Sequence, residues 1–252
     1  DKYITIKAVM FDRPGNQTEG SQSTNRLLID QISPTIVNSH IESNNVDSVK
    51  AKVDDIITLT FEVNELIQTP TMTISGGDGL VIDLGSFNWS GTYTMTETDA
   101  EGIISYTVNQ VTDARGNPVD GFTSTSDGSK VVFDRTKPLL NQVNAQTNNL
   151  WNSQWALENN YARLYVNASE NLLSINCAFN GLGTTNLQYE PNEFELGYTF
   201  SNTDTEGLIQ FEIAFVDSAG NIGDTVRTTT DNTFIIFDKT PPTNFTVGSV
   251  LG

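Results

Sequence analysis

The chain has 252 residues, with 31 acidic and 13 basic side chains, so its formal net charge at pH 7 is −18. Nucleic acids and anionic membrane surfaces are excluded as default partners, because both repel a strongly negative protein. A single cysteine, Cys177, excludes an internal disulfide framework. No apolar run approaches the ~18 residues of a membrane-spanning helix, so we expect no membrane insertion.

The first predicted element is a β-strand. Ile4, Ile6, Ala8 and Met10 alternate with other residues and would share one face of that strand. The loop 12–16, of the form Asp-x-x-Gly-Asn, follows it. A short strand pair cannot bury its apolar face alone, so we expect these four residues to form an assembly strand that packs on another segment.

The chain then repeats itself at a fixed interval. Asp30, Asp134 and Asp238 each begin an Asp-x-x-x-Pro step, and 104 residues separate each aspartate from the next. Loops of the form Asp-x-x-Gly-Asn recur at 113–117 and 217–221. Such periodicity indicates a tandem array of similar domains.

The repeat predicts four segments. Residues 1–33 match the C-terminal strands of a partial repeat, and residues 34–138 and 139–241 form two complete repeats. Residues 242–252 are then the first strand of a following repeat or a donor strand for another subunit. The junctions contain proline and no glycine, which favours short, stiff links between domains.

Both complete repeats contain alternating apolar residues typical of half-buried strands. One residue more separates Gly102 from Asp113 than separates Gly207 from Asp217, which predicts a bulge near Gln110. Residues 144–161 depart from the regular pattern. The apolar positions are Ile57, Leu59, Phe61 and Val63, then Ile104, Tyr106 and Val108, with Ile209, Phe211 and Ile213 as counterparts of the last three. Short strands separated by Gly, Asn and Asp turns predict all-β sandwiches.

These motifs carry a resemblance to a known family. Residues 111–117 and 216–221, each followed by a strand ending in Phe-Asp-x-Thr-x-Pro, resemble bacterial immunoglobulin-like repeats of large surface adhesins and extracellular fibres. The resemblance implies tandem immunoglobulin-like β-sandwich domains arranged end to end, at the cell surface or outside the cell. It also implies an adhesin stalk or filament subunit whose partners are neighbouring copies or repeats.

Two interpretations of the repeated aspartates stay open. Calcium binds several hard oxygen ligands, and some members of the resembled family bind it at domain junctions. The alternative is turn chemistry, in which Asp accepts backbone hydrogen bonds and Gly adopts positive φ. The calcium candidates are Asp12, Asp113 and Asp217 in the loops and Asp30, Asp134 and Asp238 at the junctions.

No catalytic pattern is recognisable, so we expect no enzyme activity. The single histidine, His40, lies in a Ser/Asn-rich context and has no partners for a catalytic triad or a histidine metal site. Cys177 lies in an apolar stretch and is interpreted as a small buried hydrophobe.

The aromatic residues suggest a second function. Trp151 and Trp155 are four residues apart and would share a face of one strand, where they could bind glycans. Packing of Trp89, Trp151 and Trp155 in a core or between domains is the competing interpretation. The chain also has four Asn-x-Ser/Thr sequons, at Asn16, Asn88, Asn167 and Asn244, as glycosylation candidates.

Overall fold

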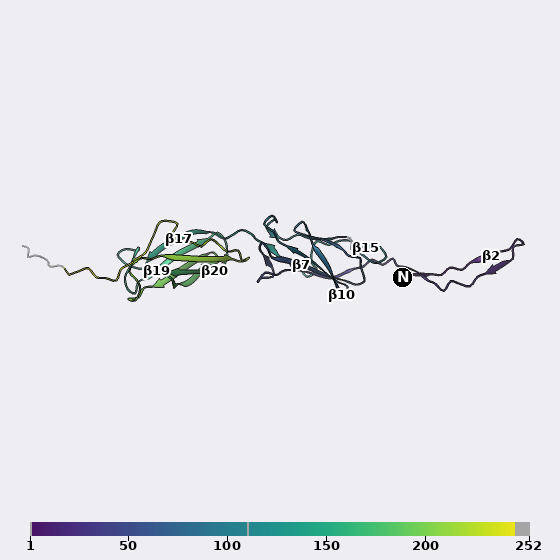
Figure 1. Ribbon diagram of the computed structural model, residues 1–252, viewed down its shortest axis with the longest axis horizontal. Helices are drawn as coiled ribbons and strands as arrows, with labels where there is room; N and C mark the ends of the chain where they lie inside the picture. The colour runs from purple at the N-terminus through teal and green to yellow at the C-terminus, as the bar shows by residue number, and fades with distance from the viewer. Residues whose placement is uncertain (1, 110, 245–252) are drawn as a thin grey trace, which may run out of the picture. The chain divides into compact units, whose positions relative to one another are not determined.

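A computed structural model describes residues 2–109 and 111–244. The secondary structure of these residues consists of β-strands and no helix (Figure 1). Consequently, no helix in this part of the chain is long and apolar enough to cross a membrane. The chain divides into two compact units, residues 1–134 and 135–252.

The first unit contains a four-stranded antiparallel sheet in the order β10-β11-β7-β5. Its strands are β5 (Ile36–Ser43), β7 (Ile56–Val63), β10 (Leu80–Gly85) and β11 (Asn88–Thr94). Along β7, Ile57, Leu59, Phe61 and Val63 are buried and the residues between them are partly exposed. The predicted alternation is therefore confirmed on the central strand of the sheet.

A second sheet faces the first. It contains β8 (Thr71–Ile74), β9 (Gly77–Asp78) and β13 (Tyr106–Asn109). The two sheets approach closely, because a Cβ atom at Gly91 of β11 would lie 2.2 Å from Sδ of Met72 in β8. Any larger residue there would have to displace the Met72 side chain. The buried side chains of both sheets form one core, as expected for a β-sandwich.

Short strands complete the first unit. They are β6 (Lys50–Ala51), β12 (Gly102–Ile103), β14 (Val111–Thr112), β15 (Pro118–Val119) and β16 (Val132–Phe133). The early strand β6 pairs in parallel with the last strand, β16, which also pairs antiparallel with β12.

The second unit repeats this arrangement. Its four-stranded sheet has the order β17-β19-β23-β22, with β17 (Leu140–Thr147), β19 (Tyr161–Ala168), β22 (Thr185–Glu190) and β23 (Glu193–Thr199). The facing sheet contains β20 (Leu172–Phe179), β21 (Leu182–Gly183) and β25 (Phe211–Asp217). The early strand β18 (Trp155–Ala156) pairs in parallel with the last strand, β26 (Ile236–Phe237), which also pairs with β24 (Gly207–Leu208). The fold is thus all-β, with immunoglobulin-like β-sandwiches in tandem, as predicted.

The irregular stretch 144–161 in the second unit is explained by its elements. Strand β17 extends to Thr147, a loop follows, and β18 begins at Trp155 before β19 starts at Tyr161. The residues of the loop are held by asparagine side chains: Asn149 Oδ1 accepts from the Trp151 N–H at 2.9 Å. The stretch therefore lacks alternation because it contains a loop between strands.

The predicted bulge at Gln110 lies outside the described residues. On either side, the spacing of buried positions changes. Tyr106 and Val108 are buried two apart, and Val111 is the next buried position, three residues on. In the second unit Ile213 and Phe215 keep a spacing of two. The buried positions that flank Gln110 are thus three residues apart, whereas the corresponding positions of the second unit are two apart.

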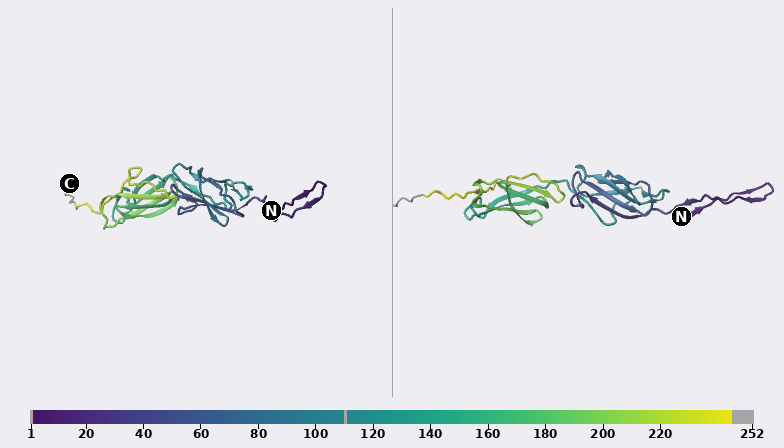
Figure 2. Two further views of the ribbon diagram at one scale, coloured as in Figure 1. Left: turned by 45° about the vertical axis from the view of Figure 1, so that its right-hand side comes forward. Right: turned by 60° about the horizontal axis from the view of Figure 1, so that its bottom comes forward.

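The N-terminal segment is a two-stranded ribbon (Figure 2). Strands β1 (Lys2–Ile4) and β4 (Leu27–Ile29) pair, as do β2 (Val9–Phe11) and β3 (Gln17–Glu19). The predicted strand through Ile4, Ile6, Ala8 and Met10 is divided into β1 and β2, although the carbonyl oxygens of Ile6 and Ala8 still accept from the N–H groups of the opposite arm at 2.8 Å and 2.9 Å. Ile6 and Met10 are 73% and 67% exposed. The apolar face of the ribbon is therefore uncovered in this structure.

Candidate metal centre

The Asp-x-x-Gly-Asn loops fold around their first residue. In the first unit, Asp113 Oδ1 accepts from the N–H groups of Arg115 and Asn117, each at 2.8 Å. Its Oδ2 accepts from Asn117 Nδ2 at 2.7 Å. Gly116 has φ of +91°, a conformation that glycine adopts without a side-chain clash. The turn role proposed for this aspartate is therefore confirmed.

The other two loops share this geometry. Asp217 accepts from Asn221 N–H at 2.8 Å and from Asn221 Nδ2 at 2.9 Å. Asp12 accepts from the same two groups of Asn16, at 2.7 Å and 2.8 Å. The glycine of each loop again has φ of +91°. The repeated sequence therefore encodes one repeated turn.

The first junction aspartate lies beside the loop of Asp113. Asn117 Nδ2 donates to the Asp30 carbonyl oxygen at 3.3 Å, and Arg115 Nε lies 3.9 Å from Asp30 Oδ2. The Asp30 side chain is only 16% exposed. Two residues of the Asp113 loop thus hold Asp30 in place.

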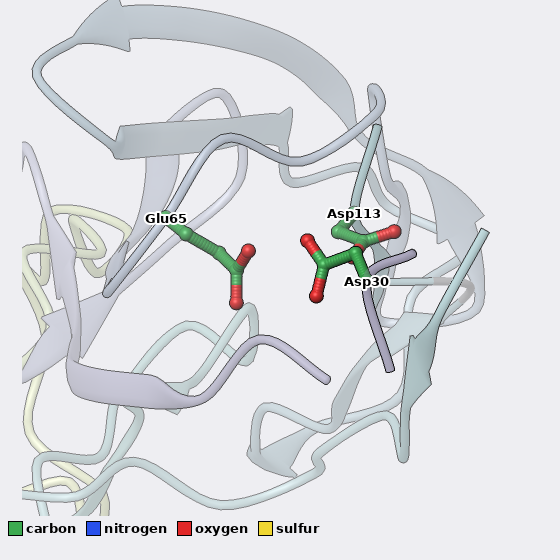
Figure 3. Close-up of side chains that lie close together, drawn as sticks. All are labelled: Asp30, Glu65 and Asp113. Atoms are coloured by element: carbon green, nitrogen blue, oxygen red, sulfur yellow. The ribbon is translucent and has the colours of Figure 1, made fainter. Parts of the chain in front are cut away.

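Glu65 reaches the same point from the end of β7. Ile67 forms a β-bridge with Asp113, and Gln68 Nε2 donates to the Asp113 carbonyl oxygen at 3.0 Å. One carboxylate oxygen from each of Asp30, Glu65 and Asp113 lies within 4.8 Å of the others. Figure 3 shows the Glu65 side chain pointing toward Asp30 and Asp113. We name these three residues the carboxylate cluster.

The electrostatics of the carboxylate cluster favour a cation. Burial, followed by repulsion from Asp113 and Asp30, raises the pKa of Glu65. Asp113 is buried, which disfavours its charge, but hydrogen bonds from Asn117 and neighbouring backbone N–H groups hold its pKa below the usual range. The Arg115 side chain approaches the carboxylate cluster at Asp30, where its Nε atom lies 3.9 Å from Oδ2. A divalent ion would relieve the remaining repulsion.

The donor set fits calcium better than softer metals. Three carboxylates are hard oxygen ligands, and calcium completes a shell of about six to eight oxygens with carbonyl groups and water. Zinc and copper favour histidine or cysteine, which the carboxylate cluster lacks. The residues present could therefore hold Ca²⁺.

Sequence reasoning had named Asp30 and Asp113 but not Glu65. A signal existed, because Glu65 and Glu170 lie 105 residues apart, close to the period of the repeat. Glu170 and Asp217 occupy the same repeat positions in the second unit. A search for acidic residues shared by both repeats would have found them.

The remaining calcium candidates have structural partners. The backbone N–H groups of Asp134 and Asp238 donate to the carbonyl oxygens of Ala51 and Ala156, both at 2.9 Å, and so extend the parallel strand pairs. Asp12 lies in the exposed tip of the N-terminal ribbon. Among the described residues, Asp12 and Asp238 belong to no group of three clustered acidic residues.

The three tryptophans have different environments. Trp89 is 5% exposed and packs in the first core, as the packing interpretation expects. Trp151 is 95% exposed in a loop, and Trp155 is 39% exposed in β18. The prediction that Trp151 and Trp155 share a strand face is wrong, because a turn separates them.

His40 contacts a carboxylate at the surface, whereas Cys177 is buried. His40 Nδ1 lies 2.6 Å from Asp127 Oδ2 on the exposed face of β5. Cys177 is 8% exposed in the second core, and burial raises the pKa of its thiol to about 12. The interpretation of Cys177 as a buried hydrophobe is confirmed.

The glycosylation candidates stay predictions. Asn16 and Asn244 are exposed, whereas Asn88 and Asn167 are half-buried. The Nδ2 atom, to which a glycan would be attached, donates to Asp12 in Asn16 and to Ser86 in Asn88. In Asn167 it donates to Glu193 at 3.3 Å.

Comparisons with known proteins found similarity in structure. No protein-family model matches the sequence, and no curated protein matches it. A structure of a 1.5-MDa bacterial ice-binding adhesin, described for host cell surface retention, is 18% identical. The match covers 91% of this chain and 72% of the adhesin chain, with a TM-score of 0.47.

Two further structures are similar over most of this chain. Fibronectin(III)-like modules of Clostridium thermocellum CbhA are 11% identical over 82% of this chain and 93% of theirs, with a TM-score of 0.35. The IG1 and IG2 domains of DIP-gamma are 10% identical over 82% of this chain and 98% of theirs, with a TM-score of 0.35.

Proposed function

We propose that this chain is a structural and adhesive protein of the cell surface or extracellular space, serving as an adhesin stalk or filament subunit. The supporting observation is that two units repeat one strand order and one hydrogen-bonded loop along the chain. An array of like units suits spacing and display better than chemistry at one centre. The carboxylates would then serve the array and no reaction.

We further propose that Ca²⁺ binds the carboxylate cluster. Asp30 belongs to the partial repeat by sequence, whereas Glu65 and Asp113 belong to the first complete repeat. An ion bound by all three would join the two segments by bonds stronger than the 3.3 Å hydrogen bond between Asn117 and Asp30. The junction would then be stiff in calcium and loose without it.

The exposed face of the N-terminal ribbon supports assembly with neighbouring copies or repeats. By repeat position, Ile4, Ile6, Ala8 and Met10 correspond to Ile209, Phe211, Ile213 and Phe215, and β25, which holds the last three, pairs with β20 in the second unit. Ile213 and Phe215 are at most 2% exposed. An equivalent strand from a neighbouring repeat would cover the ribbon.

The experiment is immunogold electron microscopy of intact and permeabilised source cells, with and without EDTA. Surface labelling of intact cells, with filaments or slender projections that change on calcium removal, is the expected result. Labelling that requires permeabilisation would refute the proposed location. Surface labelling with no response to EDTA would retain the location and refute the calcium-dependent junction.

A further inference from the structure

The outer face of the β17-β19-β23-β22 sheet is chemically unlike its inner face. Leu164 and Val166 of β19 point into the core. The residues that alternate with them, Arg163, Tyr165 and Asn167, are only partly buried. On the edge strand β22, which β23 separates from β19, every residue is exposed, and Tyr189 is 53% exposed. Aromatic and polar side chains therefore gather on one rigid surface.

A buried carboxylate organises this surface. Glu195 is 6% exposed and accepts hydrogen bonds from the hydroxyl groups of Tyr161 and Tyr189, both at 2.9 Å. Arg163 Nη1 lies 3.5 Å from Glu195 Oε2 and balances its charge. A buried charge with three partners restricts the side chains around it, so the rings are held in place before any ligand binds.

A groove of about 320 Å³ runs beside the tyrosines. Tyr165 and Tyr189 line it, together with the polar side chains of Gln142, Asn167 and Glu193. Asn167 Nδ2 donates to Glu193 Oε1 at 3.3 Å, so these two lining side chains also contact each other. Its volume lies at the lower end of the range for small-ligand sites, roughly 300–1,000 Å³.

The charges of the groove select a neutral ligand. The Arg163 guanidinium lies 4.8 Å from the centroid of the Tyr165 ring, so a cation on that ring would meet a positive charge. Glu193 and the net charge of −18 oppose an anion. Rings for apolar C–H surfaces, with amide and carboxylate groups for hydroxyls, fit a neutral sugar.

The first unit provides an internal comparison. Tyr165 pairs across the strands with Glu195, and the matching pair in the first unit is Thr60 with Ser90. Leu84 occupies the repeat position of Tyr189. The fold therefore forms without these aromatic and charged residues, so their presence in the second unit calls for another reason.

We propose that the groove lined by Tyr165 and Tyr189 binds a neutral oligosaccharide, with Gln142, Asn167 and Glu193 as hydrogen-bonding partners. This function goes beyond the proposed structural role and does not rest on calcium. It also differs from the sequence-based hypothesis of a glycan platform, because it uses neither Trp151 nor Trp155.

The test is native affinity electrophoresis of the 252-residue chain through gels containing dextran, mixed-linkage β-glucan or galactomannan, with an array of neutral oligosaccharides in parallel. We expect retention by at least one glycan and about a ten-fold loss of affinity in Tyr189→Ala, the loss expected when one aromatic contact is removed. Tyr189→Phe keeps the ring and should bind within about three-fold of the unmodified chain. Leu84→Ala, the matched change in the first unit, should bind normally.

Unfolding cannot mimic this pattern, because Gln142→Ala changes an exposed side chain and should also weaken binding. No retention by any glycan, or unchanged binding in both Tyr189→Ala and Gln142→Ala, would overturn the proposal. Loss of binding in Trp151→Ala with full binding in Tyr189→Ala would overturn it as well. Preferential binding of a trimethyl-lysine peptide would assign the groove to a cationic ligand.

Discussion

Replacement of Glu65 by glutamine should have opposite effects with and without calcium. The carboxylate oxygens of the cluster lie within 4.8 Å, where two like charges repel by about 3.5 kcal/mol at an effective dielectric constant of ~20. Glu65 is half-exposed, so solvent reduces this toward the ~1 kcal/mol expected in water. Without calcium, Glu65→Gln should therefore stabilise the first unit by on the order of 1 kcal/mol, or about 4–8 °C in Tm.

With calcium bound, Glu65→Gln should instead be less stable than the parent protein. Binding at 100 times the Kd stabilises a folded protein by about 2.7 kcal/mol, which is roughly 10–20 °C for a domain of this size. Glu65→Gln removes one of three charged ligands and should lose most of that increase. Glu158→Gln changes an exposed carboxylate outside the carboxylate cluster and serves as the charge control.

The assay is thermal unfolding followed by tryptophan fluorescence. Trp89 is the single tryptophan of the first unit, and it is buried. In a Trp151→Phe, Trp155→Phe background, its emission therefore reports that unit alone. Equal calcium shifts in Glu65→Gln and the parent protein would show that Glu65 is not a calcium ligand. A lower calcium-free Tm in Glu65→Gln would show that the carboxylates of the cluster do not destabilise the calcium-free unit.

The pH dependence follows from the raised pKa of Glu65. Because the folded state holds this proton more tightly than the unfolded state, the contribution of Glu65 to the stability of the calcium-free first unit is lost as pH rises through the folded pKa. Protons compete with calcium at the same oxygen, so the calcium shift should shrink as pH falls through the raised pKa of Glu65. Glu65→Gln should lack this contribution, so the difference between the variant and the parent protein should follow both trends.

Three further predictions concern the second unit. Gly220→Ala places a side chain on a residue with φ of +91° and should lower the free energy of unfolding by about 1–2 kcal/mol, as measured by urea denaturation. Gly183→Ala, whose Cβ atom would meet open space, should leave that free energy unchanged. Phe237→Ala removes a ring that is 0% exposed and should cost about 3–5 kcal/mol, and a loss below 1 kcal/mol would contradict its place in the core. Cys177, with its pKa raised to about 12, should react with iodoacetamide only after unfolding, and rapid labelling of the native chain would contradict its burial.

The strands were predictable because their signal is local. Alternation in β7 depends only on neighbours in sequence, and the four alternating apolar residues from Ile57 to Val63 are buried as expected. The turn role of Asp113 was also predictable, since its partners lie within four residues. Local hydrogen bonding and periodicity thus determined most of the fold.

Contacts between segments far apart in the chain were harder to predict from the sequence. Glu65 meets Asp113 because Ile67 bridges to that residue across the fold, and nothing near Glu65 in sequence specifies this pairing. The Tyr165–Glu195 pair likewise depends on the register of β19 and β23. The prediction that Trp151 and Trp155 share a strand face failed for a different reason. Residues four apart lie on one face only where the strand is continuous, and a turn precedes Trp155.

The parallel pairs near the ends of each unit have a mechanical consequence. In the second unit, Ile236 N–H donates to the Gln154 carbonyl at 2.8 Å, and Asp238 N–H donates to the Ala156 carbonyl at 2.9 Å. The same pairing in the first unit joins β6 to β16. If tension pulled the chain in opposite directions through such a pair, it would load these bonds in shear, so they would have to break together and not one at a time. Each unit would then resist a sustained pull according to its unfolding rate.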